Sequence, residues 1–146
     1  MSAGDPLALA VATAAGSPAY SDDGVVVHWL RYHLVLATRR RKPFFADAEL
    51  AARADELVRE AAEGAGCRVA ACAVHPSWVT LEVEAPAGVA PSRLATVIAR
   101  GAGGTLKGES EAVRKAGAAF VHRYLVSTEA VPEGDRAAFV GRVPTR

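Results

Sequence analysis

Four stretches of the chain have the apolar patterning of β-strands. The run Val25–Thr38 is rich in β-branched and aromatic residues, which favours one long strand. Pro43 follows it and ends the strand, because proline offers no donor to a ladder. Residues 67–74 and 78–85 predict two strands joined by a tight hairpin turn, and residues 120–128 predict a fourth strand.

Three further stretches have helical periodicity. Residues 47–64 place apolar residues three and four positions apart and end at glycines, which predicts a helix. A second helix is expected to begin with Ser92 as its N-cap. Four glycines after Arg100 weaken the pattern, so we expect this helix to end near Arg100 rather than continue to Lys115. Residues 135–142 predict a short last helix.

The resulting order is strand, helix, strand, strand, helix, strand, helix. This order predicts an α+β fold of the ferredoxin-like or RRM-like type, with an antiparallel sheet and helices on one face. A length of 146 residues suits one domain, which we place at residues 24–146. Residues 1–23 are rich in small residues and lack apolar periodicity, so we expect a flexible leader there.

Composition and charge narrow the functional classes. Seventeen Lys and Arg residues against sixteen Asp and Glu residues leave a formal net charge of +1, so any affinity for nucleic acid must come from a local patch. Two cysteines, Cys67 and Cys72, are too few for a disulfide framework and suit a reducing compartment. No apolar run is long enough to span a bilayer. We therefore expect a cytoplasmic protein with no membrane partner.

A basic cluster stands at the end of the first predicted strand. No acidic residue lies between Gly24 and Ala46, and clustered arginines there could contact phosphates. A simply solvated loop is an equally compatible interpretation. Trp29 and Tyr32 could stack on bases, although aromatics in a strand are more often part of a core. The candidate nucleic-acid-binding residues are Arg31, Arg39, Arg40, Arg41 and Lys42.

The strand at 78–85 alternates strictly. Val79, Leu81, Val83 and Ala85 fall on one face, which we assign to the core; Trp78, Thr80, Glu82 and Glu84 fall on the other. Two carboxylates on one face could bind a cation or act as acid and base, or could form the solvated side of the sheet. The four histidines form no ligand motif, so the sequence indicates no metal site.

Three sequence segments, taken in their order along the chain, form a recognisable set: YHLVLATRRR at 32–41, HPSWVTLEVEAP at 75–86 and YLVST at 124–128. The segment PSRLATVI at 91–98 follows the second of them. Together they resemble the single-tyrosine HUH transposases of the insertion-sequence-200-like type, small DNA-nicking enzymes that act as dimers on hairpin ends. The resemblance covers about residues 25–143. It implies a homodimer whose protomers join their sheets, with the last helix of each completing the other's site.

The chain departs from that family where the chemistry takes place. In the family two histidines separated by one residue hold a divalent metal, a tyrosine on the last helix attacks DNA, and a glutamine four residues later completes the metal site. The resemblance places these groups at Trp78, Thr80, Phe139 and Val143. An indole cannot ligate a hard cation, and a phenyl ring has no attacking oxygen. The resemblance therefore predicts that nicking activity is lost and that no metal or other cofactor is bound.

Three hypotheses for the function remain open. The first is a domesticated transposase-like domain that binds hairpin or single-stranded DNA as a regulator or accessory factor. The second is a former active-site cleft that now binds a small molecule or supports a new biosynthetic activity. The third is a protein–protein adaptor, which no sequence feature supports specifically. The pocket of the second hypothesis would consist of His75, Trp78, Thr80, Glu82 and Phe139.

Overall fold

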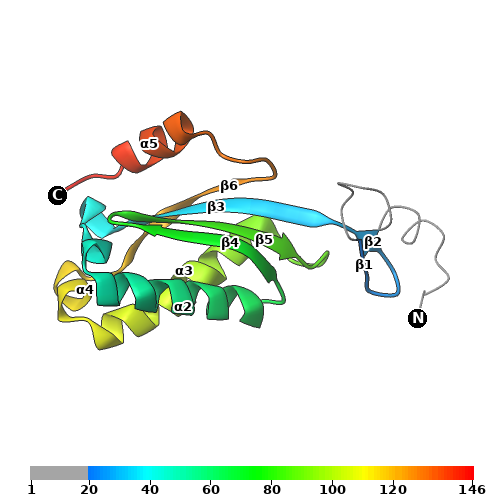
Figure 1. Cartoon of the computed structure of the whole chain (residues 1–146), viewed down its shortest axis with the longest axis horizontal. Helices are drawn as coiled ribbons and strands as arrows, with labels where there is room; N and C mark the ends of the chain where they lie inside the picture. Colours follow the sequence, from blue (N-terminus) through cyan, green and yellow to red (C-terminus); the bar gives the residue numbers. More distant parts are fainter. Residues whose placement is uncertain (1–19) are drawn as a thin grey trace.

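The computed structural model describes residues 20–146, and a four-stranded antiparallel sheet lies at its centre (Figure 1). The strands are β3 (Leu30–Thr38), β4 (Arg68–His75), β5 (Trp78–Ala85) and β6 (Phe120–Ser127), in the order β4-β5-β3-β6. Both β3–β5 and β3–β6 pair antiparallel, as does the hairpin β4–β5. The predicted α+β class and its sheet are confirmed.

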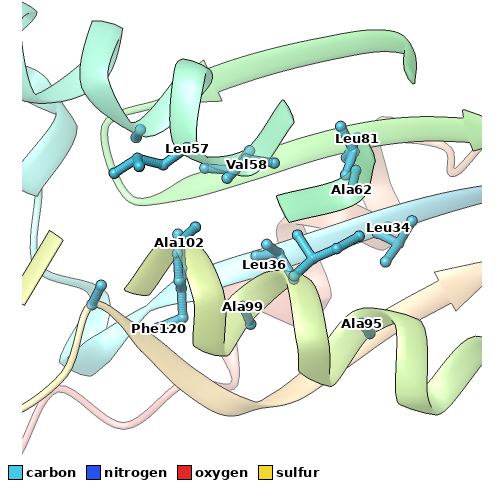
Figure 2. Close-up of a cluster of buried hydrophobic side chains, with 14 of the residues drawn as sticks. Leu34, Leu36, Leu57, Val58, Ala62, Leu81, Ala95, Ala99, Ala102 and Phe120 are labelled. Atoms are coloured by element: carbon cyan, nitrogen blue, oxygen red, sulfur yellow. The ribbon is translucent and has the colours of Figure 1, made fainter. Parts of the chain in front are cut away.

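Three helices cover one face of this sheet: α2 (Ala48–Gly64), α3 (Pro91–Glu109) and α4 (Glu111–Ala116). The Asp47 carboxylate caps α2 by accepting from the amides of Glu49 and Leu50. The core lies between these helices and the sheet (Figure 2). Its sheet side includes the face of β5 assigned to the core from alternation, which is confirmed: Val79, Leu81, Val83 and Ala85 are buried.

The helix α3 is longer than predicted. It continues past Arg100 to Glu109, although glycines within a helix disfavour it by about 1 kcal/mol each. Packing outweighs this penalty, because Ala102 and Leu106 in the extension are fully buried against the core. The predicted N-cap is also wrong: Ala90 takes the cap position, and Pro91 begins the helix.

The last helix, α5 (Glu133–Gly141), lies across the opposite face of the sheet (Figure 1), which the expectation of helices on one face missed. Val140 and Val143 are buried there against Val35 and Ala37 of β3. The reason is local: these two β3 side chains are apolar and point away from the main core, so they need a cover of their own. The sheet is therefore covered on both faces at this end.

The first predicted strand is divided. A short ribbon pairs β1 (Ser21–Asp22) with β2 (Val27–His28), and the long strand begins only at Leu30. The Asp23 carboxylate accepts from two backbone amides of the intervening turn, at 2.9 and 2.7 Å. Residues 20–23 of the expected leader thus belong to a ribbon, and residues 1–19 lie outside the described residues. In the part of the chain that the structure describes, no helix is long and apolar enough to cross a membrane.

Candidate functional site

The α5 face of the sheet brings together three of the four positions that the resemblance singled out. Trp78 and Phe139 pack against the buried pair Val140 and Val143 in a small second core. The imidazole of His75 stacks on the Trp78 indole, with ring centroids 4.7 Å apart and planes 16° from parallel. The result is a filled apolar contact, whereas the sequence predicted an open concavity at these residues.

A cavity of about 220 Å³ opens beside this second core. Thr80 and Glu82 line it, as predicted, but His75, Trp78 and Phe139 do not, so the predicted pocket is divided. Two residues that the sequence did not single out, His33 and Arg136, complete its polar lining. Alternation along the first strand puts His33 on the face of Thr80 and Glu82. No pattern in the sequence places Arg136 there.

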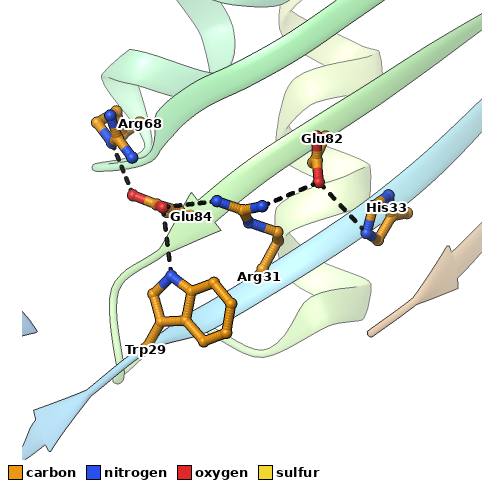
Figure 3. A network of polar contacts seen from close by, with 6 residues as sticks. All are labelled: Trp29, Arg31, His33, Arg68, Glu82 and Glu84. Atoms are coloured by element: carbon orange, nitrogen blue, oxygen red, sulfur yellow. Dashed lines mark hydrogen bonds and ion pairs between the residues drawn. The ribbon is translucent and has the colours of Figure 1, made fainter. Parts of the chain in front are cut away.

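The far end of the same face holds a network of charged side chains (Figure 3). The Arg31 guanidinium lies 3.3 Å from a Glu82 oxygen and 3.0 Å from a Glu84 oxygen. Arg68 Nε donates to the other Glu84 oxygen at 2.6 Å, and the Trp29 indole donates to Glu84 at 3.3 Å. Both oxygens of Glu84 are thus held by arginines, whereas Glu82 contacts Arg31 and His33 through a single oxygen. The two carboxylates therefore do not form a free pair that could hold a cation together.

This network separates Arg31 from the rest of the predicted basic cluster. Arg39 follows Arg31 by eight positions along an extended strand, which corresponds to about 26 Å. Trp29 remains with Arg31, its ring 5.0 Å from the guanidinium carbon, and Tyr32 is buried in the core. In the sequence all these residues lie close together, and closeness in sequence does not show that an extended strand separates them in space.

Glu84 is the strongest electrostatic feature of the face. The Arg68 hydrogen bond, followed by those from Arg31 and Trp29, lowers the pKa of Glu84 from 4.5 to about 2, against the opposing effect of burial. A carboxylate with a lowered pKa stabilises the fold fully above its unfolded-state pKa. That contribution is lost as the pH falls from 4.5 toward 2.

We expect Glu84→Gln to lower the free energy of unfolding by about 1 kcal/mol at pH 7, a modest value because solvent screens the exposed Arg68. The measurement is urea denaturation at pH 7 and at several values below pH 4.5, where the difference from the unsubstituted protein should shrink. Glu63→Gln, on the exposed side of α2, is the control. A Glu84→Gln protein as stable as the original at pH 7 would contradict this role.

The remaining predicted basic residues form a turn that we call the basic loop, Arg39–Lys42. Arg40 and Arg41 adopt left-handed backbone angles, with φ of 55° and 54°. The buried Thr38 hydroxyl holds the loop, lying 2.8 Å from the Lys42 carbonyl oxygen and 3.0 Å from that of Ser77. The Ser77 hydroxyl in turn donates to the Arg41 carbonyl. These bonds fix an arginine-rich turn in a conformation that non-glycine residues rarely adopt.

The basic loop borders a hollow of about 250 Å³ next to the C-terminal tail. Arg39 and Arg40 line it together with His122 of β6 and Arg146. None of the described residues lining it is acidic. Among residues 20–146, no carboxylate comes within ion-pair distance of Arg39, Arg40 or Arg41. The loop therefore presents positive charge that the described part of the protein leaves uncompensated.

Comparisons with known proteins agree with this fold. The sequence profile described as "Transposase IS200 like" matches residues 26–133, so the match ends at the first residue of α5. A crystal structure of a protein from Deinococcus radiodurans R1, described provisionally as a transposase, has a TM-score of 0.70 at 22% identity and covers 82% of this chain and 92% of its own. A REP-associated tyrosine transposase bound to a REP hairpin has a TM-score of 0.49 at 11% identity, over 84% of this chain and 70% of its own. No curated protein matches the chain.

Proposed function

The chain belongs to the IS200-like transposase family, and from this premise we propose that it is an inactive member that binds nucleic acid through the basic loop. The observation that carries the proposal is the second core: Trp78 and Phe139 fill the place where the family resemblance puts a metal ligand and the attacking tyrosine. The arginines of the loop, which have no acidic partner among residues 20–146, support the proposed binding of nucleic acid.

The residues present do not fit the divalent metal of the family. The indole of Trp78 offers no lone pair to a cation, and the half-buried Thr80 hydroxyl alone is a weak ligand. Among residues 20–146, no three His, Cys, Asp or Glu side chains gather closely enough to hold a metal ion. Without a charge clamp or an oxygen nucleophile, transesterification of DNA has no route at this site.

The basic loop has the chemistry that a phosphate backbone requires. Arginine keeps its charge at every physiological pH and presents planar donors that pair with phosphate oxygens. Arg40, Arg41 and Lys42 are exposed, so a nucleic acid can reach them without rearrangement of the fold. Contacts of this kind give affinity with little sequence preference, which suits a regulator or accessory factor that attaches to DNA.

We further propose that the protein is a homodimer in the reducing cytoplasm. Within the described residues β6 is an edge of the sheet, so a second copy can pair with its free backbone groups. Both cysteines are free thiols, as expected in a reducing compartment. Within one copy α5 packs on the sheet of its own chain, and the exchange of last helices that the resemblance implies stays a prediction for the dimer.

The binding proposal is tested with a labelled hairpin DNA titrated over a series of salt concentrations. We expect the affinity to fall linearly on a log–log plot, and Arg39→Ala/Arg40→Ala to reduce the slope by about 2, or about 0.9 for each lost phosphate contact. The matched control Arg59→Ala/Lys115→Ala removes the same charge from exposed helical sites and should leave the binding unchanged. No binding by the unsubstituted protein at low salt would refute the proposal.

The proposed inactivity has a separate test. The protein is incubated with a single-stranded oligonucleotide and magnesium or manganese, and the products are resolved on a denaturing gel. No covalent protein–DNA product is expected. A shifted covalent band would show that an active nucleophile is present and that the alignment of Phe139 with the tyrosine is wrong.

The cavity beside the second core favours a second candidate function, binding of a small molecule. Thr80, Glu82, His33 and Arg136 bring a hydroxyl, a carboxylate, an imidazole and a guanidinium to one hollow with apolar walls. A ligand carrying both a cationic and an anionic group would pair with it best. A thermal-shift screen of zwitterionic and heteroaromatic metabolites tests this candidate, and the absence of any stabilising compound would count against it.

A further inference from the structure

We propose that the nucleic-acid-binding surface extends beyond the basic loop, across β6 and onto the exposed face of α3. There Arg93, Arg100 and Lys107 contact phosphates along the stem of a DNA duplex. The inference rests on the proposed function, because it names the form of nucleic acid that is bound and the rest of its footprint. The basic cluster predicted from the sequence includes neither these three residues nor the face of α3.

The three basic residues of α3 form a row. They are spaced seven residues apart, which is close to two helical turns, so they share one face and follow one another at about 10 Å along the axis. All three are exposed, and the opposite side of α3 is buried in the core. The one acidic residue within α3, Glu109, is bound by Arg53 of α2 through two contacts of 2.9 Å. The row is therefore positive and not offset by acids of its own helix.

Three hollows join this row to the basic loop. One of about 250 Å³ lies between α3 and β6 and is lined by Arg100, Lys107, His122 and Tyr124. It shares His122 with the hollow of the basic loop, and it shares Arg100 with a hollow at the start of α3 that includes Arg93. None of the described residues that line the three hollows is acidic. They form one continuous basic path.

Glycine marks the middle of the path. Gly104 lies one turn from Arg100 and from Lys107, is exposed, and has open space where a side chain would stand. Packing does not require a glycine at this position, because a Cβ there would have no other atom within 4 Å. A glycine disfavours the helix here by about 1 kcal/mol. The smooth surface that it leaves lets a phosphate approach the helix backbone between two cationic side chains.

The occupant that suits this path is a duplex. The row on α3 alone spans about 21 Å, which exceeds the reach of a nucleotide or other small anion. Proteins that hold single strands stack the bases on exposed aromatic rings. Along this path the aromatic residues are Phe120, which is buried, and Tyr124, which is half-buried. Phosphate contacts without base stacking are the means by which proteins hold the stem of a hairpin.

The experiment compares a DNA hairpin with a single strand of equal length in salt titrations of the full chain. We expect Arg93→Ala/Lys107→Ala to reduce the log–log slope for the hairpin by about 1.8 and the affinity about tenfold near 0.1 M salt. Gly104→Glu, which favours the helix but adds a negative charge to the path, should weaken hairpin binding at least threefold. Gly104→Gln, equal in size and uncharged, is its matched control and should bind more tightly than Gly104→Glu.

The outcomes separate this inference from the proposed function. If Arg39→Ala/Arg40→Ala weakens hairpin binding while Arg93→Ala/Lys107→Ala and Gly104→Glu do not, the α3 surface is refuted and the function stands. If the unsubstituted protein binds no DNA, the function itself fails. If the single strand binds as tightly as the hairpin and is equally sensitive to the α3 variants, the assignment to a duplex is overturned.

Discussion

Trp78→His, Thr80→His and Phe139→Tyr in combination are expected to lower the free energy of unfolding by about 3 kcal/mol and to leave the protein without nicking activity. These substitutions give the chain three of the four side chains that the family resemblance assigns to an active site, and Val143 stays in the place of the glutamine. They also remove the partly buried indole that packs against the second core and add a phenol hydroxyl beside apolar side chains. The loss of the indole accounts for most of the expected effect.

Urea denaturation measures the loss of stability, and a denaturing gel after incubation with single-stranded DNA and manganese measures activity. Thr80→His alone is the control, because Thr80 lines the neighbouring cavity and the change should leave stability nearly unaffected. A triple variant that was as stable as the original and became covalently attached to DNA would contradict our account of the second core. Such a result would mean that three substitutions are enough to restore the active site of the family.

Thr38→Val is expected to lower the free energy of unfolding by about 2 kcal/mol and to weaken DNA binding several-fold. The Thr38 side chain is completely buried, and its hydroxyl is shared between the carbonyl oxygen of Lys42, at the end of the basic loop, and that of Ser77, in the turn between β4 and β5. Valine keeps the shape and removes the hydroxyl. Arg40 and Arg41 hold left-handed conformations that disfavour each residue by about 1 kcal/mol, so a loop without this anchor should relax.

Denaturation and a hairpin titration measure the two effects of Thr38→Val. Thr38→Ser, which keeps the hydroxyl, should retain both stability and affinity to within a factor of about two in binding. If Thr38→Val lost stability but bound the hairpin as the original does, the conformation of the loop would not matter for binding. The arginines would then act through their charge alone.

Most of the fold could be predicted from the sequence, because each element is determined by residues that are close together in the chain. Residues 78–85 alternate, residues 47–64 have helical periodicity, and the run 25–38, whose part 30–38 forms β3, is rich in β-branched residues. Each of these patterns is visible within a short segment of the sequence. The extension of α3 was not accessible in this way. Its glycines argue for an end at Arg100, and only the burial of Leu106 in the assembled core overrides them.

The candidate site was harder to predict from the sequence, because it depends on distances in space that the order of residues does not give. Arg31 and Arg39 are near in sequence and lie at opposite ends of β3. Trp78 and Phe139 were expected to line one concavity. Both instead pack against the cluster that includes Val140 and Val143, which fills the space between the end of the chain and the sheet. The row on α3 was not accessible either, because the glycines after Arg100 predict an end of the helix there, which leaves Lys107 outside it.

The sheet separates the second core from the basic row of α3. The second core lies under α5 on one face, whereas the row of α3 lies on the helical layer of the other face (Figure 1). A substitution that silences chemistry beneath α5 does not reach the side chains of α3. If the proposed inactivity and the proposed DNA binding both hold, the face under α5 can lose its catalytic role while selection keeps the binding surface on the other face.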